Sequence, residues 1–208
     1  MAGSLRVDHA VSSGTFSLDG ETFEVDNNIW VVGDDDECVV IDAPHSVADI
    51  LAVTAGRSVK AILLTHAHDD HCRVAPALRE AVIAPIFLHP DDKPLWSLVH
   101  EDHLWDLDLP DGWEFELAGA SIRTLHTPGH APGACSFLVE DLGCVFTGDT
   151  LFRGGPGATG RSFSDRPQLE ESIRTRLFAL PDATVVHTGH GDDTTIGAER
   201  ADSFDWDA

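Results

Sequence analysis

Positive charge is scarce in this 208-residue chain, which carries 13 lysine and arginine residues against 36 aspartate and glutamate residues. Lys60 and Lys93 are its two lysines, and its formal net charge at pH 7 is −23. Nucleic acids and anionic membrane surfaces bind proteins through clustered basic side chains. The composition therefore argues against both as partners, and it disfavours hydrolysis of RNA or DNA.

Long apolar runs are also missing, since no stretch approaches the roughly 18 residues that a membrane-spanning helix needs. The first residues lack the basic segment followed by an apolar segment that marks a secretory signal. We therefore expect a cytoplasmic protein. The hydrophobic fraction of 42% is sufficient for a core, and the length predicts one domain over residues 1–208.

The chain has four cysteines and no Cys-x-x-Cys pair. Cys38, Cys135 and Cys144 lie in apolar, strand-like stretches, which predicts reduced core residues. Cys72 follows a histidine cluster directly and would lie near any metal bound there. Adjacency in the chain does not make it a ligand, and a structural role is the favoured interpretation.

That histidine cluster occupies positions 66 to 71, which read His66-Ala67-His68-Asp69-Asp70-His71. Divalent metals such as Zn(II) favour imidazole and carboxylate ligands, and the spacing is typical of a dinuclear site. The apolar stretch 59–65 before it predicts a buried strand. Because α/β proteins place their sites just past strand ends, we expect a metal site here. A solvated polar loop is the competing interpretation.

The remaining patterns predict two packed sheets with helices outside, without a boundary between two halves. Strands are predicted at 9–16, 22–25, 29–33, 38–42, 86–88, 113–117, 121–126, 134–139, 144–147 and 184–187. Helices are predicted at 46–55, where Ser46 would be the N-cap, at 74–81 and at 168–180. Residues 90–110 favour neither state.

Three later segments repeat the pattern of a strand that ends in a potential ligand. They place His130 in Thr127-Pro128-Gly129-His130, Asp149 in Thr147-Gly148-Asp149-Thr150, and His190 in Thr188-Gly189-His190-Gly191. A lone histidine after a strand is more often structural than a ligand. Four such segments in one chain together supply five histidines and two aspartates, enough ligands for two metals.

In this order and spacing the four motifs resemble the metallo-β-lactamase superfamily, and the glyoxalase II-like hydrolases are the most similar branch. The resemblance extends from about residue 29 to residue 197. It implies an α/β fold: a four-layer αβ/βα sandwich of two mixed sheets flanked by helices, with metals in a groove at one edge. The implied cofactors are two divalent ions, with zinc expected and iron as the alternative.

The resemblance also implies how the ligands divide. His66, His68 and His130 would hold the first metal, Asp70, His71 and His190 would hold the second, and Asp149 would bridge both. The implied reaction is hydrolysis of a thioester of a low-molecular-weight thiol by a hydroxide shared between the metals, with Asp70 orienting that nucleophile. The glycine-rich stretch after Asp149 also resembles this branch, and its combination with residues 188–195 resembles small actinobacterial members, some of which are associated with mycothiol thioesters.

Two features separate this chain from familiar members of the superfamily. Classical glyoxalase II enzymes bind glutathione partly through a C-terminal helical domain with tyrosine and lysine, whereas this chain has no tyrosine and stops at Ala208. That mode of glutathione recognition is therefore not expected. The β-lactamases of the superfamily lack the bridging aspartate, so Asp149 argues against antibiotic hydrolysis.

Two other functions compete with the hydrolase. The runner-up is a persulfide dioxygenase, whose single iron would be held by His66, His130 and Asp149. The other is a noncatalytic metal-binding or sensor protein. The intact second site, with Asp70, His71 and His190, favours hydrolysis. The sequence leaves the oligomeric state open.

Several further residues are candidates for supporting roles. Asp42, Asp69 and Thr150 could accept the second N–H of a ligand imidazole. His126 and His187 are interpreted as structural. The cations near the candidate site could bind a substrate carboxylate, although ordinary loop ion pairs are the stronger expectation; they are Arg153, Arg161 and Arg166.

Overall fold

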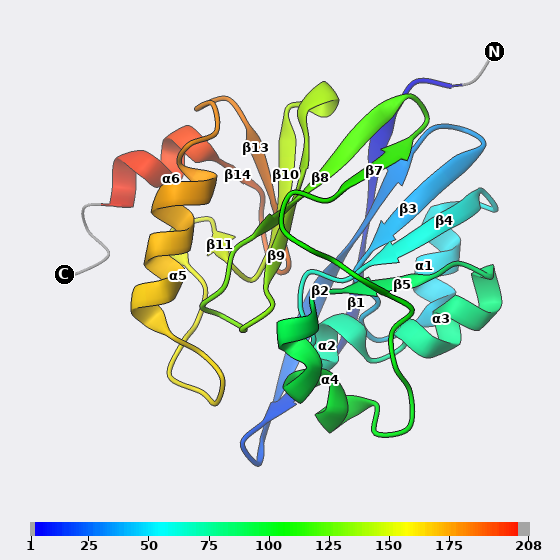
Figure 1. Ribbon diagram of the computed structural model, residues 1–208. Coiled ribbons are helices and arrows are strands. Elements are labelled where there is room, and N and C mark those ends of the chain that lie inside the picture. Colours follow the sequence, from blue (N-terminus) through cyan, green and yellow to red (C-terminus); the bar gives the residue numbers. More distant parts are fainter. Residues whose placement is uncertain (1–2, 204–208) are drawn as a thin grey trace.

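The computed structural model describes residues 3–203 and shows two six-stranded sheets packed face to face (Figure 1). Residues 1, 2 and 204–208, at the two ends of the predicted domain, lie outside the described part. The first sheet has the order β1 (Arg6–Leu18), β2 (Glu21–Gly33), β3 (Glu37–Ile41), β4 (Ser58–Leu63), β5 (Ile86–Leu88) and β6 (Leu107–Asp108). The second has the order β14 (Thr194–Thr195), β13 (Val185–Thr188), β10 (Cys144–Gly148), β9 (Cys135–Val139), β8 (Ala120–His126) and β7 (Glu114–Leu117).

Both sheets are mixed. In the first, β1, β2 and β3 pair antiparallel, whereas β3 through β6 run parallel. In the second, β10 and β13 are parallel and the other neighbours are antiparallel. A small hairpin, β11 (Leu151–Phe152) and β12 (Gly155–Pro156), follows β10. Parallel neighbours bring successive strand ends to the same edge, where ligands from distant segments can meet.

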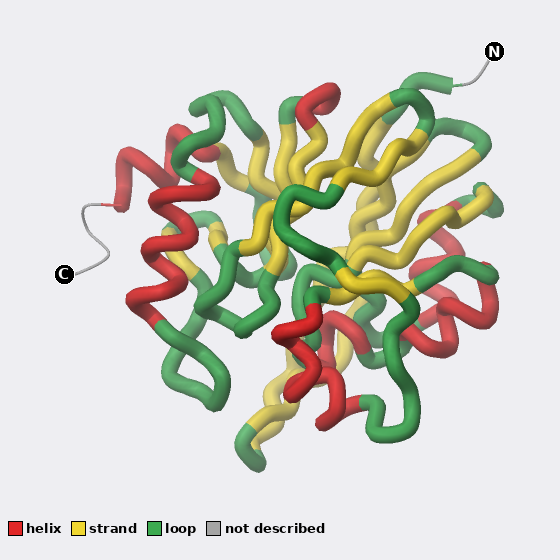
Figure 2. The backbone as a smooth tube through the Cα atoms, in the orientation of Figure 1, coloured by secondary structure: helices red, strands yellow, loops and turns green. Residues whose placement is uncertain are grey.

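Helices cover the outer face of each sheet (Figure 2). On the first sheet they are α1 (Val47–Thr54), α2 (Asp69–Cys72), α3 (Ala75–Val82) and α4 (Lys93–Val99), which begins after the 3₁₀ turn Pro90–Asp92. On the second they are α5 (Arg166–Ser172), which continues into the π-helical turn Ile173–Leu177, and α6 (Ile196–Asp202). A 3₁₀ turn, Glu140–Leu142, joins β9 to β10. The predicted four-layer sandwich is therefore confirmed.

Successive side chains of β2 point alternately into two different cores, which is why its run of apolar residues is continuous. Ile29 and Val31 point into the core beneath the helices, whereas Trp30 and Val32 point into the core between the sheets. Both faces of the strand are buried, so both sets of side chains must be apolar. On the other sheet, Leu169, Ile173 and Ile196 close a third core beneath α5 and α6.

The predicted helices are found with small shifts in their ends. Ser46 caps α1 by accepting a hydrogen bond from the backbone N–H of Asp49, and Pro76 lies in the first turn of α3. The predicted helix 168–180 begins earlier, because the Asp165 side chain caps it, and its last turn is π-helical. The sequence patterns did not predict β11, β12, β14 or α6, and the ambiguous segment 90–110 forms α4 and β6.

One strand prediction was wrong. The segments 22–25 and 29–33 belong to the single strand β2, which pairs along its whole length with β1. Asp26, Asn27 and Asn28 suggested a break because aspartate and asparagine are uncommon in strands. Here the side chain of Asn28 hydrogen-bonds the carbonyls of Thr188 and Gly191, so packing against the second sheet outweighs local preference.

Within residues 3–203, every helix is too short or too polar to cross a lipid bilayer.

Candidate metal centre

The seven predicted ligands lie in four loops, each of which follows a strand. The loop after β4 and the short helix α2 carry four of them, the β8–β9 loop carries His130, and Asp149 and His190 follow β10 and β13. The strand ends stand side by side at one edge of the sandwich, so the loops converge. All seven side chains meet there, as predicted for a site past the strand ends.

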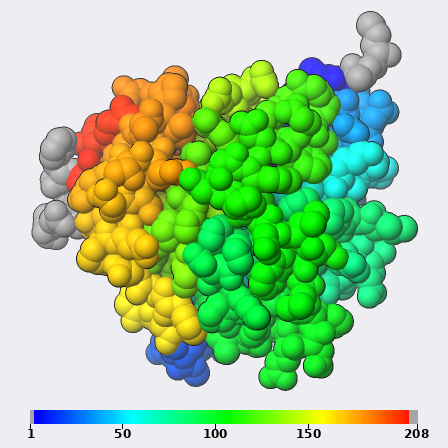
Figure 3. All heavy atoms as spheres, in the orientation of Figure 1, coloured from blue at the N-terminus to red at the C-terminus, as the bar shows by residue number. Residues whose placement is uncertain are grey.

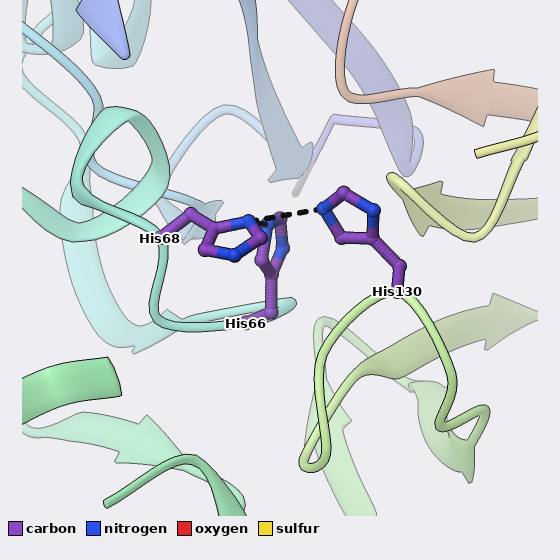
Figure 4. Close-up of side chains that lie close together, drawn as sticks. All are labelled: His66, His68 and His130. Carbon is purple, nitrogen blue, oxygen red and sulfur yellow. Dashed lines mark hydrogen bonds between the residues drawn. The ribbon is translucent and has the colours of Figure 1, made fainter. Parts of the chain in front are cut away.

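His66, His68 and His130 form the first trio (Figure 4). The Nε2 atoms of His66 and His130 each lie 3.0 Å from Nδ1 of His68. The three rings are nearly perpendicular to one another and all three side chains are buried. Three ring nitrogens from two loops therefore point at one small volume.

Asp70, His71 and His190 form the second trio. Nε2 of His71 lies 3.3 Å from Nε2 of His190, and Oδ2 of Asp70 lies 3.6 Å and 3.3 Å from these two nitrogens. Asp70 and His71 stand on α2, whereas His190 comes from the other sheet. The second trio thus brings together residues from the two sheet-and-helix layers of the sandwich.

Asp149 stands between the two trios. Its Oδ2 lies 3.6 Å from Nε2 of His130 and 3.4 Å from Nε2 of His190, while its Oδ1 lies 3.3 Å from Nε2 of His71. Gly189 makes room for this carboxylate, because a Cβ at that position would lie 2.2 Å from Oδ1. This placement is the one that a bridging ligand requires.

The second ring nitrogens of three ligand histidines support the same interpretation. Nδ1 of His130 donates to the carbonyl of Ala158, and Nδ1 of His190 donates to that of Asp26. Nδ1 of His71 lies 2.8 Å from the Asp42 carboxylate. Ligand histidines typically donate their other N–H to a carbonyl or carboxylate in this way, which leaves the Nε2 lone pair for the metal.

The spacing of the ligand atoms fits a divalent metal. Tetrahedral zinc with Zn–N bonds of about 2.0–2.1 Å separates its ligand atoms by about 3.3 Å. The five ligand-atom distances given above are 3.0–3.6 Å. In addition, Oδ1 of Asp149 is buried and accepts no hydrogen bond within the described residues. Buried carboxylate oxygens are normally paired, so this atom is available to a cation.

The two trios differ in charge. Burial lowers the pKa of His68 to about 3 and that of His66 well below its usual value, so both rings are neutral, as a metal ligand must be. Burial acts in the same direction on His190, but Asp149 and Asp70 outweigh it and raise its pKa to about 10. A cation bound at the second trio would therefore displace the proton of His190.

Two buried carboxylates accept hydrogen bonds from the loops that carry the ligands. Asp42 accepts hydrogen bonds from the backbone and hydroxyl of Thr65, next to the first ligand, as well as from His71. Asp92 accepts from the backbone N–H groups of Ala67 and Gly133, at 2.7 Å and 2.5 Å. Asp42 was predicted in this supporting role, whereas no local pattern indicated Asp92.

Other supporting candidates have different partners. The Thr150 hydroxyl contacts that of Thr127 and does not reach a ligand ring, so that prediction was wrong. Asp69 forms an ion pair with Arg73 and accepts a hydrogen bond from the backbone of Ser17, which ties α2 to β1. Cys72 is buried and donates to the Ala67 carbonyl, and burial raises the pKa of its thiol well above the usual value.

His126 and His187 have structural partners, as predicted. Nε2 of His126 donates to the Pro132 carbonyl, and Nδ1 of His187 pairs with Asp193. His126 also approaches His89 and Asp91, but its ring stacks on that of His89 at 3.9 Å and 10°. Lone pairs in two parallel ring planes cannot converge on one ion, so this grouping is no metal site.

Asn27 is a residue of the centre that sequence reasoning missed. Its amide nitrogen lies within 3.4 Å of all three members of the second trio. Two consecutive asparagines before a buried strand, without glycine or proline to make a turn, were the signal that could have revealed it.

The centre forms the floor of a cavity of about 450 Å³. Phe16, Phe23 and Phe152 make much of its wall, and Arg161, Ser162 and Ser164 come from the loop before α5. The backbone of Ser162 donates to Asp19 at the tip of the β1–β2 hairpin, and Arg161 pairs with Glu21 there. Figure 3 shows the blue hairpin tip against the yellow loop at the lower edge.

The chain is similar to known proteins of one family. The family model of the metallo-beta-lactamase superfamily matches residues 22–190. A Haemophilus influenzae protein named hydroxyacylglutathione hydrolase GloC is 34% identical over 189 residues, covering 83% of this chain and 89% of that protein.

Two solved structures share the fold. The crystal structure of TTHA1623 in a di-iron-bound form is 36% identical with a TM-score of 0.75, and the match covers 85% of this chain and 93% of that one. The BLEG-1 B3 metallo-beta-lactamase is 27% identical with a TM-score of 0.77, and the match covers 91% and 97%. From the family model, the sequence likeness and the fold, the chain belongs to the metallo-beta-lactamase superfamily.

Proposed function

We propose that this protein is a metal-dependent hydrolase of thioesters formed with a low-molecular-weight thiol. The observation that carries the proposal is the convergence of two ligand trios on a shared Asp149 at the floor of a cavity. The likeness to a protein named hydroxyacylglutathione hydrolase supports the thioester as the substrate class. Mycothiol and glutathione thioesters are both candidates.

The residues present fit two divalent ions, with His66, His68 and His130 at one, Asp70, His71 and His190 at the other, and Asp149 shared. When bound, such ions supply Lewis acidity toward a carbonyl and a hydroxide nucleophile at neutral pH. Zinc suits this imidazole and carboxylate set, and the di-iron form of a related protein makes iron the alternative.

Asp70 is the residue to which we assign orientation of the nucleophile. Its carboxylate is buried between His71 and His190 and borders the cavity. Burial raises its pKa, but the two histidines outweigh this and lower it to about 2, so the group stays ionised. An ionised oxygen at this position can accept a hydrogen bond from an attacking hydroxyl.

The cavity wall would contact the parts of the substrate that lie on either side of the thioester. Phe16 lies 5.2 Å from the His68 ring and Phe152 lies 6.2 Å from the His190 ring, so apolar surfaces flank the reacting atoms on both sides. They exclude water and hold an apolar acyl or thioether portion. A thiolate is a stable leaving group, so the reaction needs no strong general acid.

Metal analysis combined with a substrate screen tests the proposal. The purified protein should contain two metals per chain and hydrolyse at least one of the lactoyl or formyl thioesters of glutathione, mycothiol and related thiols. A β-lactam is the control substrate and should not be cleaved. Activity that survives verified metal removal would contradict the mechanism. A protein with two metals and no turnover of any thioester would support the metal-binding or sensor function instead.

A second candidate is a persulfide dioxygenase with one iron held by His66, His130 and Asp149. Two histidines and one carboxylate are a recurring iron site, and the carboxylate of Asp149 lies 3.6 Å from Nε2 of His130. One iron per chain and oxygen consumption with a persulfide would identify this activity. Two metals and no oxygen consumption would exclude it.

A further inference from the structure

Asn27 lies on β2, and its side chain faces the second trio. Its side chain is buried, with 1% of the residue exposed. The terminal amide nitrogen lies 3.1 Å from Oδ2 of Asp70, 3.3 Å from Nε2 of His71 and 3.4 Å from Nε2 of His190. One amide end therefore faces all three atoms that would hold the second metal.

These four atoms form a nearly regular tetrahedron. The three distances from Asn27 are 3.1–3.4 Å, and the three distances among the trio are 3.3–3.6 Å. Ligand atoms around a tetrahedral zinc with bonds of about 2.0–2.1 Å are separated by about 3.3 Å. The amide end thus stands at ligand distance from the centre of the trio, as a donor additional to the shared Asp149, and leaves that centre free.

The chemistry of the amide decides which atom must stand there. Half a turn of the amide plane exchanges its oxygen and nitrogen with almost no change of shape. An NH₂ group facing the trio donates hydrogen bonds to lone pairs that a cation would use. The oxygen has lone pairs of its own and binds hard and borderline cations, so only this orientation accommodates a metal.

His45 accommodates both orientations. Its Nε2 lies 2.7 Å from the other end of the Asn27 amide, the oxygen in the present arrangement. A neutral imidazole can donate or accept at Nε2, depending on which nitrogen carries the proton. With the NH₂ group turned outward, Nε2 of His45 accepts from it, and the ring proton sits on Nδ1. His45 can therefore hold the amide with its oxygen toward the metal.

We propose that Asn27 is a further ligand of the second metal, bound through Oδ1, and that His45 hydrogen-bonds the outward end of its amide. The inference rests on the two-metal centre proposed above but not on the identity of the substrate. A neutral oxygen is well matched to this site because Asp70 and Asp149 already supply two carboxylates.

Two substitutions at this position separate a ligand from a hydrogen-bond donor. N27L keeps a similar volume without a polar atom, whereas N27D offers oxygen at both ends and no donor. If Asn27 binds metal through oxygen, zinc affinity at the second site should fall about tenfold or more in N27L and should be retained or increased in N27D. If Asn27 only donates to Asp70, both variants should lose affinity.

The measurement is metal binding itself. Metal-free protein is titrated with Zn²⁺ in competition with a chromophoric chelator, and the dissociation constants of the first and second ion are compared. T22A is the matched control, because it removes an exposed hydroxyl contact with Ser17 on the same hairpin without touching the trio. Unaltered second-site affinity in N27L, or equal losses in N27L and N27D, would overturn the proposal.

The wild-type protein offers an independent readout if a variant does not fold. Asn27 and Asn28 are the two asparagines of the chain, so ¹⁵N-asparagine labelling gives two side-chain amide signals. The second equivalent of zinc should shift one of them strongly and leave the other nearly unchanged. Two unshifted signals would contradict coordination. Because neither readout needs a substrate, failure of the thioesterase proposal would leave this test intact.

Discussion

The carboxylate of Asp42 lies 2.8 Å from Nδ1 of His71 and accepts two further hydrogen bonds from Thr65. Asp42 itself adopts a left-handed backbone conformation, with φ of 63°. It directly follows β3, and its side chain lies beneath the ligand loop. One buried carboxylate thereby sets both the ring orientation of a second-site ligand and the course of the chain leading to His66.

We expect D42A to weaken binding of the second metal about 10- to 100-fold, because the His71 ring loses the acceptor that fixes its tautomer. Zinc titration of the metal-free protein measures this directly. Asp141, exposed at the far end of β9, supplies the control variant D141A, which should bind metal as the wild type does. Wild-type affinity in D42A would show that the Asp42–His71 contact does not orient the ligand.

The parts of this centre that could be predicted from sequence are those that depend on residues close together in the sequence. Three histidines within six residues after an apolar stretch mark both a strand end and a ligand cluster. Asp42 was predictable because it ends a strand with a polar side chain. Asp92 was not, and the Asn27–Asn28 pair indicated an unusual polar position but not its role, because both Asp92 and Asn27 act on loops that are distant in the sequence. Their roles depend on which strand ends become neighbours, which local patterns do not encode.

The same distinction applies to the fold. The period of apolar residues located α1 and α3, since each needs only its own amphipathic face and cap. The continuity of β2 through Asn28 was missed because its side chain finds partners on the other sheet. Short elements such as β14 are likewise set by pairing with β13 rather than by their own two residues.

Asp92 should make stability depend on pH. Burial raises the pKa of its carboxyl to about 7 from a usual value of 3.8. Between about pH 4 and pH 7 the native state therefore holds a proton that the unfolded state has released, so the free energy of unfolding falls as the pH rises. D92N is neutral at every pH and should lack this slope, while being less stable overall because an N–H donor loses its acceptor.

Urea unfolding at several pH values measures both effects. D141N is the control, because Asp141 is exposed and is not among the groups that shift the pKa of Asp92, so it should leave the slope unaltered. A wild-type slope in D92N would show that other groups cause the pH dependence.

Gly189 should tolerate no side chain. A Cβ there would lie 2.2 Å from Oδ1 of Asp149 and 2.8 Å from Cε1 of His71. We expect G189A to displace the shared carboxylate and to reduce bound metal below two ions per chain, which elemental analysis of the purified variant can measure. Thermal unfolding monitored in parallel will show whether the variant is folded. Two tightly bound ions in G189A would show that the carboxylate can move without loss of its role.

Arg161 is the cation that the structure places at the cavity, whereas Arg153 and Arg166 form ion pairs with Asp192 and Glu170. Its guanidinium stands 4.6 Å from the Phe23 ring and pairs with Glu21 on the hairpin tip. It is 32% exposed, so it can also meet a substrate carboxylate. We expect R161A to raise KM for an anionic thioester about tenfold, roughly 1.4 kcal/mol, with little change in kcat.

Arg153 provides the matched control, because its side chain is 67% exposed and lies outside the cavity lining. R153A should leave KM within about twofold of the wild type. A thioester whose thiol carries no carboxylate separates binding of charge from support of the wall: its KM should respond less to R161A than that of the anionic substrate. Equal increases for both substrates would mean that Arg161 acts by holding the hairpin against the loop, since that role is independent of substrate charge.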